Sequence, residues 1–183
     1  MRDSLFKRLP DSDGPLGTSE RRALYDAYYE SLSSVDYSGS GDLLRYFARD
    51  FFHDSPMTHV RFESGAQSFG FCAASLNVEV GEHKCLSPGP EFDVLFERVV
   101  GLDWRCDAKN QRIYIESEID GRPDLIAEAQ GEHGGRFHSI AINAYRESIE
   151  LVFGSVRVSP LDPARWCEIE ADPGLHVLGL FEA

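Results

Sequence analysis

Residues 92–104, FDVLFERVVGLDW, decide the fold class of this chain because apolar and charged side chains alternate along them. The apolar positions of one parity are Phe92, Val94, Phe96, Val100, Leu102 and Trp104, and the charged positions of the other parity are Asp93, Glu97 and Asp103. Successive side chains of a β-strand point to opposite faces, so this pattern predicts a strand with one face in a core and the other in water. It is typical of antiparallel sheets that are solvated on one side.

Similar alternation predicts further strands on the C-terminal side of this stretch. Ile113 and Ile115 alternate with polar side chains, and so do Ile140 and Ile142. Within residues 148–158 the apolar positions change parity at a Gly-Ser pair, where we expect a β-bulge to restore the register. The chain therefore has the pattern of a mainly antiparallel β-structure.

Two pairs of similar segments indicate a worn internal β repeat. Residues 59–71 and 138–151 each have the pattern of a strand, a polar turn and a second strand, and residues 92–101 are similar to residues 149–158. Unrelated alternating hairpins share this appearance, so duplication and chance similarity both remain open.

A further segment, residues 124–130, fits a helical turn and a strand equally well.

The N-terminal part of the chain is predicted to be an arm followed by two short helices. Residues 10–19 are turn formers and small polar residues apart from one leucine, so we expect a flexible arm over residues 1–19 and a single domain over residues 20–183. A first helix then runs to about Ser34, and a second follows Asp42 as its cap. We therefore expect an α+β fold, in which two N-terminal helices pack on a mainly antiparallel sheet or sandwich.

The charge of the chain restricts its partners. The 183 residues include 18 Lys and Arg against 31 Asp and Glu, which gives a formal net charge of −13. Such a charge repels phosphate backbones and anionic lipid and attracts basic proteins. No stretch approaches the ~20 apolar residues of a membrane span, and residues 1–9 lack the apolar core of a secretion signal. We expect a soluble, cytoplasmic protein with reduced cysteines, no nucleic-acid or membrane partner, and a basic protein as the partner its charge favours.

Carboxylates form the first set of candidate binding residues. Asp93, Glu97 and Asp103 share one face of the predicted strand 92–104, and Glu116 and Glu118 share a face of the next predicted strand. We expect these five side chains to form an acidic binding surface. The alternative is that they are the ordinary solvated face of a sheet.

Titratable side chains near predicted loops form the second set. His53, Asp54 and Ser55 are adjacent, but neighbouring residues of an extended chain point to opposite sides and cannot form a Ser-His-Asp relay, so we expect a turn there. His133 stands in a glycine-rich segment that we expect to be a flexible loop open to ligands. His138 has the parity of the predicted core and is expected to be partly buried.

No spacing predicts a metal or cofactor site. His83 and Cys85 stand two residues apart, but the chain contains no Cys-x-x-Cys pair and no His-x-x-x-His pair. It also lacks a phosphate-binding loop, a dinucleotide-binding fingerprint and a nucleophile elbow. We therefore expect no cofactor, no metal and no catalytic residues.

The segment Phe52-His53-Asp54-Ser55 before a predicted strand resembles a motif of small bacterial domains of unknown function, some of them immunity-like. The resemblance extends over residues 46–64. It implies a bacterial, cytosolic and non-enzymatic protein, and it brings no catalytic residues with it.

Two classes of function remain open from the sequence. The first is a non-enzymatic, immunity-like domain whose acidic sheet face binds a basic protein. The second is a small-ligand-binding protein or hydrolase that uses loop histidines and carboxylates in a pocket between helices and sheet. A homo-oligomer is compatible with both, paired through the aromatic residues Tyr25, Tyr28, Tyr29 and Tyr37.

Overall fold

The computed structural model describes residues 18–33, 37, 40–49, 51–80, 84–106, 116–144 and 147–180. In this part of the chain the helices are α2 (Thr18–Ser33), α3 (Gly41–Phe47), α4 (Pro123–His133) and α5 (Pro163–Ala171). The strands are β1 (Met57–Glu63), β2 (Ser68–Ala74), β3 (Val78–Val80), β4 (Glu91–Glu97), β5 (Gly101–Cys106), β6 (Glu116–Ile119), β7 (His138–Ala144), β8 (Glu147–Phe153), β9 (Ser155–Pro160) and β10 (Leu175–Val177). The predicted α+β class with antiparallel sheets is confirmed.

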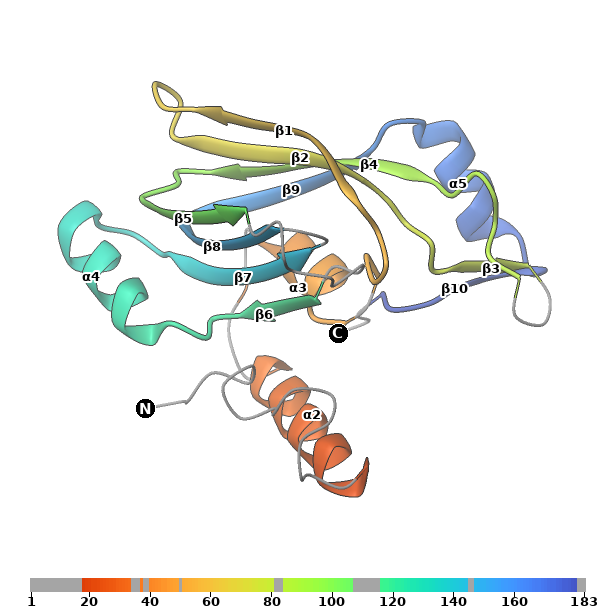
Figure 1. The fold of residues 1–183 in the computed structure, drawn as a ribbon, viewed down its shortest axis with the longest axis horizontal. Helices are drawn as coiled ribbons and strands as arrows, with labels where there is room; N and C mark the ends of the chain where they lie inside the picture. Colours follow the sequence, from red (N-terminus) through yellow and green to blue (C-terminus); the bar gives the residue numbers. More distant parts are fainter. Residues whose placement is uncertain are drawn as a thin grey trace.

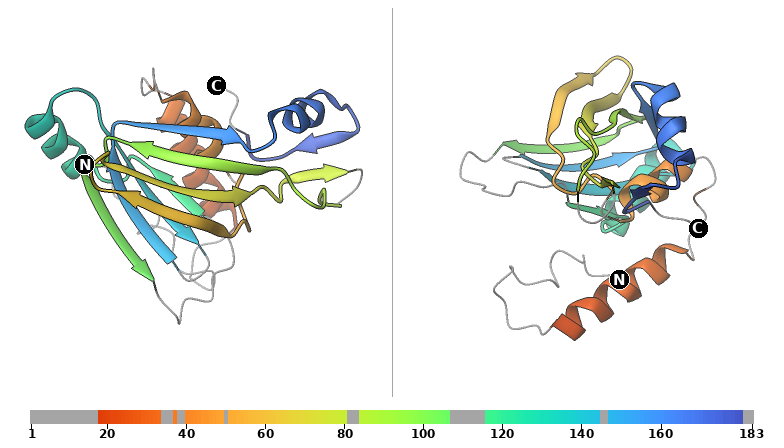
Figure 2. Two further views of the ribbon diagram at one scale, coloured as in Figure 1. Left: turned by 90° about the horizontal axis from the view of Figure 1, so that it is seen from above. Right: turned by 90° about the vertical axis from the view of Figure 1, so that its right-hand side faces the viewer.

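The strands form two four-stranded sheets and one short ribbon. The first sheet has the order β1-β2-β4-β9, the second has the order β5-β8-β7-β6, and β3 pairs with β10. Every pair is antiparallel. The sheets face each other with α3 at one side (Figure 1), and seen from above the strands of the second sheet run obliquely to those of the first (Figure 2).

Residues 92–104 are two strands in different sheets, so the prediction of one continuous strand is wrong. The chain leaves the first sheet at the end of β4, turns at Arg98 with φ 54°, and enters the second sheet as β5. The chain passes between the sheets again at Gly154, from β8 to β9. Since β4 pairs with β9 and β5 with β8, these strands make one long antiparallel ribbon that bends from one sheet into the other.

The parity change at Gly154 is therefore a crossing between sheets and not the expected β-bulge. The amide of Gly154 donates to the carbonyl of Glu97 at 3.0 Å, which joins the two bends of the ribbon. A Cβ on Gly154 would lie 3.0 Å from Cδ of Arg98, so glycine leaves room for this arginine side chain at the bend. We call the paired strands β4–β5 and β8–β9 the bent ribbon.

The two sheets have the same internal arrangement. In the first sheet β1, β2 and β4 are followed by β9, and in the second sheet β6, β7 and β8 are followed by β5. Each half of the chain thus contributes three strands to its own sheet and a fourth to the other. Strands β4 and β5 hold the same places as β8 and β9, so the sequence similarity of residues 92–101 and 149–158 agrees with this arrangement. Residues 59–71 lie in β1 and β2, whose equivalents are β6 and β7. Their similarity to residues 138–151, which lie in β7 and β8, therefore does not agree with it.

An aromatic core fills the space between the sheets. The largest side chains with less than 2% exposure include Phe47, Phe51, Phe52, Phe69, Phe71, Phe92, Phe96 and Phe153. Phe96 of β4 and Phe153 of β8 meet edge to face, with ring centroids 4.8 Å apart, and so connect the two sheets. Such ring pairs contribute about 0.5–1.5 kcal/mol beyond the burial of their area.

The helices differ from their predictions in detail. The second helix, α3, ends at Phe47, and Phe51 is buried from the turn that follows it. Asp42 does not cap this helix, since its carboxylate accepts from the amide of Val158 on β9 at 2.9 Å. Residues 124–130, which were undecided, belong to α4. The expected arm, residues 1–19, lies outside the described residues except for Thr18 and Ser19, which begin α2; the predicted strand at Ile113 and Ile115 lies outside them entirely.

Gly70 of β2 is a close contact between strands. Arg61 of β1 crosses above it to reach Asp93 of β4, and a Cβ on Gly70 would lie 2.8 Å from both Cζ of Arg61 and the carbonyl oxygen of Val94. We expect Gly70→Ala to lower the free energy of unfolding, measured by urea denaturation, by about 1–3 kcal/mol.

The matched control for this variant is Gly131→Ala, since a Cβ on Gly131 of α4 would meet nothing within 4 Å. Alanine is the better helix former, so the control is expected to leave stability unchanged or raise it by up to about 1 kcal/mol. Equal denaturation midpoints for Gly70→Ala and the unsubstituted chain would contradict the proposed close contact.

Candidate functional site

The structure does not bring the five candidate carboxylates together. Asp93 and Glu97 lie on the outer face of the first sheet, and Asp103 lies on β5 at one edge of the second sheet. Glu116 and Glu118 lie on β6 at the opposite edge, with β8 and β7 in between. The expectation of one continuous acidic face is therefore wrong.

Glu118 is also not a surface residue, because only 4% of it is exposed. Its carboxylate packs close to Gly121, where a Cβ would lie 2.9 Å from its Cδ. The side chain of Glu116 lies outside the described part of the structure. Neither residue can be assigned to an exposed binding surface.

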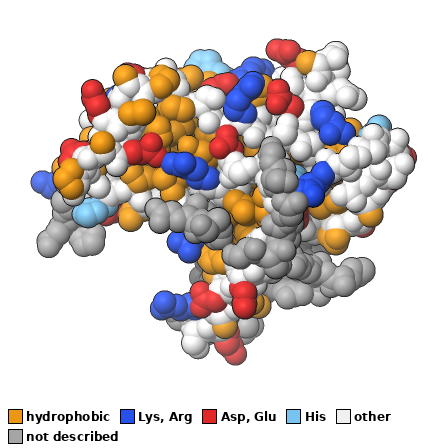
Figure 3. Space-filling view, turned by 180° about the vertical axis from the view of Figure 1, so that it is seen from behind, with side chains coloured by type: hydrophobic (Ala, Val, Ile, Leu, Met, Phe, Trp, Pro, Cys, Tyr) orange, Lys and Arg blue, Asp and Glu red, His pale blue; other side chains and the backbone are white. Residues whose placement is uncertain are grey.

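Each of the three outward-facing carboxylates, Asp93, Glu97 and Asp103, has an arginine beside it. Asp93 pairs with Arg61 at 2.7 Å, and Asp103 pairs with Arg105 at 2.5 Å. Glu97 of β4 lies 3.9 Å from a guanidinium nitrogen of Arg157 on the neighbouring strand β9. Hydrogen bonds from Arg105 hold the pKa of Asp103 below its ordinary value. On the rear face of the molecule, acidic and basic side chains are interspersed (Figure 3).

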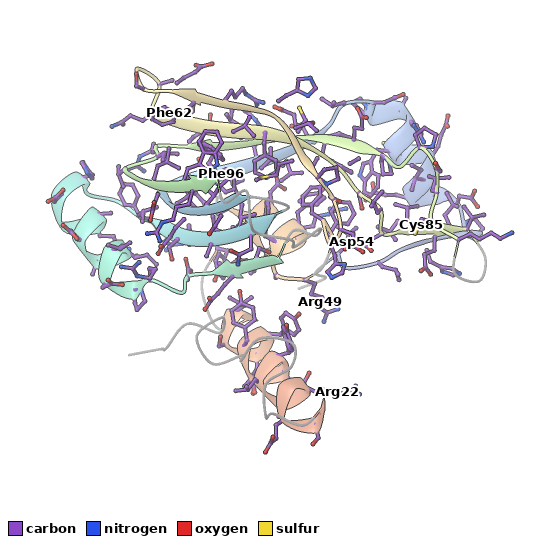
Figure 4. The ribbon with its side chains drawn as sticks, in the orientation of Figure 1. Arg22, Arg49, Asp54, Phe62, Cys85 and Phe96 are labelled. Carbon is purple, nitrogen blue, oxygen red and sulfur yellow. The ribbon has the colours of Figure 1, made fainter. Side chains whose placement is uncertain are left out.

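His53 and Asp54 form the turn that the sequence predicts between α3 and β1. Asp54 has a left-handed backbone with φ 64°, and the amide of Ser55 donates to the carbonyl of Phe52 at 3.0 Å. His53 Nδ1 lies 3.4 Å from Asp54 Oδ2. Figure 4 shows Asp54 and Arg49 close to this junction, well away from Phe62 at the far end of β1.

His133 is the last residue of helix α4, so the prediction of a flexible loop is wrong. Pro123 occupies the first turn of this helix and Asp124 adds a negative charge there, both of which favour a helix N-terminus. His133 lies on a hollow of about 180 Å³ between α4 and the bent ribbon, together with Glu128 and Glu132.

His138 is buried in the core, as its parity predicts, with 2% of it exposed. Its Nδ1 lies 3.3 Å from Asp120 Oδ2, and the ring of Tyr37 stacks on it at 5.1 Å. Asp120 also accepts from the hydroxyl of Tyr37 at 3.1 Å and from the amide of Ser139 at 3.0 Å. Nε2 of His138 has no hydrogen-bond partner among the described residues.

The three histidines therefore occupy three separate places, since His53 and His133 line two different hollows and His138 lies in the core. One lies in the turn before β1, one at the end of α4, and one inside the core. No group of three or more metal-ligating side chains occurs within the described residues. No helix in that part of the chain is long and apolar enough to cross a membrane.

Two of the four tyrosines considered as a surface for pairing subunits make contacts within the chain. Tyr37 is buried against His138, and the hydroxyl of Tyr28 accepts from the amide of Ile119 at 2.7 Å. Burial raises the pKa of Tyr28 far above its ordinary value, so this hydroxyl stays protonated. Helix α2 is thereby attached to β6 at the edge of the second sheet (Figure 1).

Leu102 and Trp104 of β5 were predicted to face the core but are exposed, and the sequence did not single out Phe62 of β1, which is exposed as well. The exposed fractions are 50% for Phe62, 36% for Leu102 and 45% for Trp104. All three have the parity of the core, since they pair in register with the buried residues Phe69, Leu151 and Ile149. They are exposed because each lies on the edge strand of its sheet.

We call Phe62, Leu102 and Trp104 the open edge. Phe69 links its two aromatic members, because it is the cross-strand neighbour of Phe62 and its ring lies edge to face with Trp104 at 6.3 Å. The open edge is therefore where the space between the two sheets reaches the surface.

No protein-family model, no curated protein and no solved structure shows significant similarity to the chain.

Cys72 lies on the outer face of the first sheet and is half-buried. Its thiol is 3.8 Å from Asp93 Oδ1. Burial, and then the negative charge of Asp93, raise the pKa of this thiol. Since the thiolate is the reactive form, a raised pKa leaves less of it at a given pH and slows alkylation.

We expect Asp93→Asn to lower the pKa of Cys72 and speed its reaction with iodoacetamide, measured peptide by peptide by mass spectrometry between pH 7 and pH 9. The exposed Cys167 serves as internal control and should react at the same rate in both proteins. An unchanged rate at Cys72 would show that burial alone sets its reactivity.

Proposed function

We propose that the chain is a non-enzymatic protein-binding domain and that the open edge is its contact surface. The observation that carries this proposal is the exposure of two large aromatic side chains and a leucine at core-facing positions of edge strands. Aromatic residues, Trp above all, are enriched among the residues that dominate binding energy at protein interfaces. Fully burying a side chain of this kind contributes about 1.5–3 kcal/mol, and covering the exposed half or less of these three contributes about half of that each.

The other three sheet edges have a hydrogen-bond partner from another element or an irregular register, which supports this assignment. At the edge of β9, Asp42 accepts from the amide of Val158. At the edge of β6, Tyr28 accepts from the amide of Ile119. At β1 the register shifts between Thr58 and Arg61, and such irregularities protect an edge from pairing.

Strand β5 differs from these three edges. Its register with β8 is regular from Gly101 to Cys106, and none of the described residues pairs with its outer side. A regular edge strand is a template for strand addition, in which an extended segment of a partner continues the sheet by main-chain hydrogen bonds. Alternate side chains of that segment would then pack on Leu102 and Trp104.

The net charge of the chain indicates which kind of partner segment would bind at β5. With a net charge of −13 the chain attracts positively charged partners and repels acidic ones. We therefore infer an occupant that is an extended, basic segment of another protein with apolar residues at alternate positions. Residues 46–64 resemble small bacterial domains of unknown function, some of them immunity-like, and a role in neutralising a basic protein agrees with that resemblance.

The test is selection of a displayed library of random short peptides on the immobilised protein, followed by affinity measurement of the enriched sequences. We expect enriched peptides to combine Lys or Arg with alternating apolar residues. Trp104→Ala should weaken their binding by at least about tenfold, and Phe62→Ala should also weaken it. Binding should decline as salt is raised, because exposed charges are screened within ~10 Å at 0.1 M salt.

The matched control is Leu161→Ala, which removes a side chain that is 53% exposed in the loop after β9. It should leave peptide affinity unchanged. Trp104 also packs on Phe69, so thermal denaturation of each variant must show a folded protein at the assay temperature. Equal affinities for Trp104→Ala and Leu161→Ala would disprove the assignment of the open edge.

A further inference from the structure

The hollow between α4 and the bent ribbon lies at the beginning of β5, the strand whose outer side is unpaired among the described residues. Gly101, the first residue of β5, lines this hollow together with Val100 and Val152. Figures 1 and 2 both show α4 beside this end of the second sheet. A segment added along β5 therefore runs from the open edge towards the hollow.

The register of β5 with β8 shows on which face of the sheet the hollow lies. Leu102 pairs with Leu151, and the parity of this pair faces the core. Gly101 pairs with Val152, which has the opposite parity and packs in an apolar cluster with Ala129 of α4. Helix α4 therefore lies on the outer face of the second sheet. A residue of an added strand opposite Gly101 would point to this outer face, and glycine has no side chain that would separate it from the hollow.

Two glutamates of α4 give the hollow a negative charge. Glu128 and Glu132 are four residues apart, and so on one face of the helix, and both line the hollow. Neither pairs with an arginine or lysine in the described part of the chain, and Glu132 lies 3.7 Å from His133. Arg98, at the same end of the bent ribbon, donates to the carbonyl of Gly134 at 3.1 Å instead. These two glutamates therefore differ from the three outward-facing carboxylates of the strands, each of which has an arginine beside it.

The size and the walls of the hollow fit one long side chain. Its volume of about 180 Å³ is below the range of about 300–1,000 Å³ that is typical of small-molecule sites. Its walls include the apolar residues Val100, Leu125, Ala129 and Val152, whereas the two glutamates are exposed. Lysine and arginine bury an apolar stem and keep their charge at the surface, which matches this arrangement.

We propose that this hollow binds the basic side chain of the partner segment that adds to β5. The segment runs antiparallel to β5, because antiparallel pairing is the more stable per residue. Its two apolar residues lie opposite Trp104 and Leu102. The next residue, a lysine or arginine opposite Gly101, enters the hollow and pairs with Glu128 and Glu132.

The partner segment thus has the order apolar, any residue, apolar, basic. This inference rests on the proposed strand addition at the open edge. It adds the direction of the added strand, the spacing of its residues and the place that receives its charge.

The experiment is a titration of the full chain with two fluorescein-labelled peptides of identical composition, followed by fluorescence anisotropy. The first peptide, Ser-Thr-Ile-Thr-Val-Lys-Ser-Thr, carries its lysine directly after the second apolar residue. The second peptide, Ser-Lys-Ile-Thr-Val-Thr-Ser-Thr, carries it directly before the first apolar residue. We expect the first peptide to bind about fivefold more tightly, because its lysine meets two carboxylates, whereas the lysine of the second lies opposite Arg105.

Glu128→Gln combined with Glu132→Gln should remove this difference by weakening the first peptide about fivefold. The matched control is Glu91→Gln combined with Glu168→Gln, which removes two exposed carboxylates from β4 and α5. The control loses the same charge and should keep the preference for the first peptide. Equal affinities of the two peptides for the unsubstituted chain, or equal behaviour of the two double variants, would overturn the inference.

Trp104→Ala separates this inference from the proposed function. If it weakens both peptides while the two peptides bind the unsubstituted chain equally, the open edge binds the segment and the hollow does not receive its basic side chain. If it leaves both affinities unchanged, the proposed function fails and the inference fails with it. Tighter binding of the second peptide, or no saturable binding of either peptide at millimolar concentration, also overturns the inference.

Discussion

The bent ribbon is the constraint on which the rest of the structure depends. Because the same two stretches of chain supply strands to both sheets, the inner faces of the two sheets are fixed relative to each other by covalent continuity. The hydrogen bond from Gly154 to Glu97 closes the ribbon at its bends, and Phe96 meets Phe153 just inside them. Helix α3 and the remaining strands complete a core that this ribbon has already outlined.

The sequence predicted local features well and pairings poorly, for a physical reason. Alternation of side chains is a property of each strand alone, so Phe92, Val94 and Phe96 could be assigned to the core without knowing their neighbours. The bend at Arg98 leaves the parity of the apolar positions intact, so nothing in residues 92–104 reveals that the chain changes sheets. The bend at Gly154 does change the parity, but a β-bulge produces the same signal.

The candidate sites could be predicted only in part for the same reason. Asp93 and Glu97 were correctly expected on an outer face, but the arginines beside them come from β1 and β9, which are distant in sequence. The hollow beside α4 depends on Val100 and Val152, which no local pattern connects with Glu128. The exposure of Trp104 depends on its strand being the last in its sheet, which is a property of topology and not of composition.

Among the described residues, the likeness of the two sheets makes the difference between two of their edges clear. Strands β5 and β9 hold equivalent positions, each at the end of a sheet to which the other half of the chain contributes three strands. Helix α3 lies against β9, where Asp42 occupies the edge, and the described residues contain no second helix that does the same for β5. Because only one helix lies against either of these two equivalent edges in the described part of the chain, the edge of β9 is covered and the edge of β5 is not. The edge of β5 keeps both its regular backbone and its exposed core-facing side chains, and these are the two properties that strand addition by a partner requires.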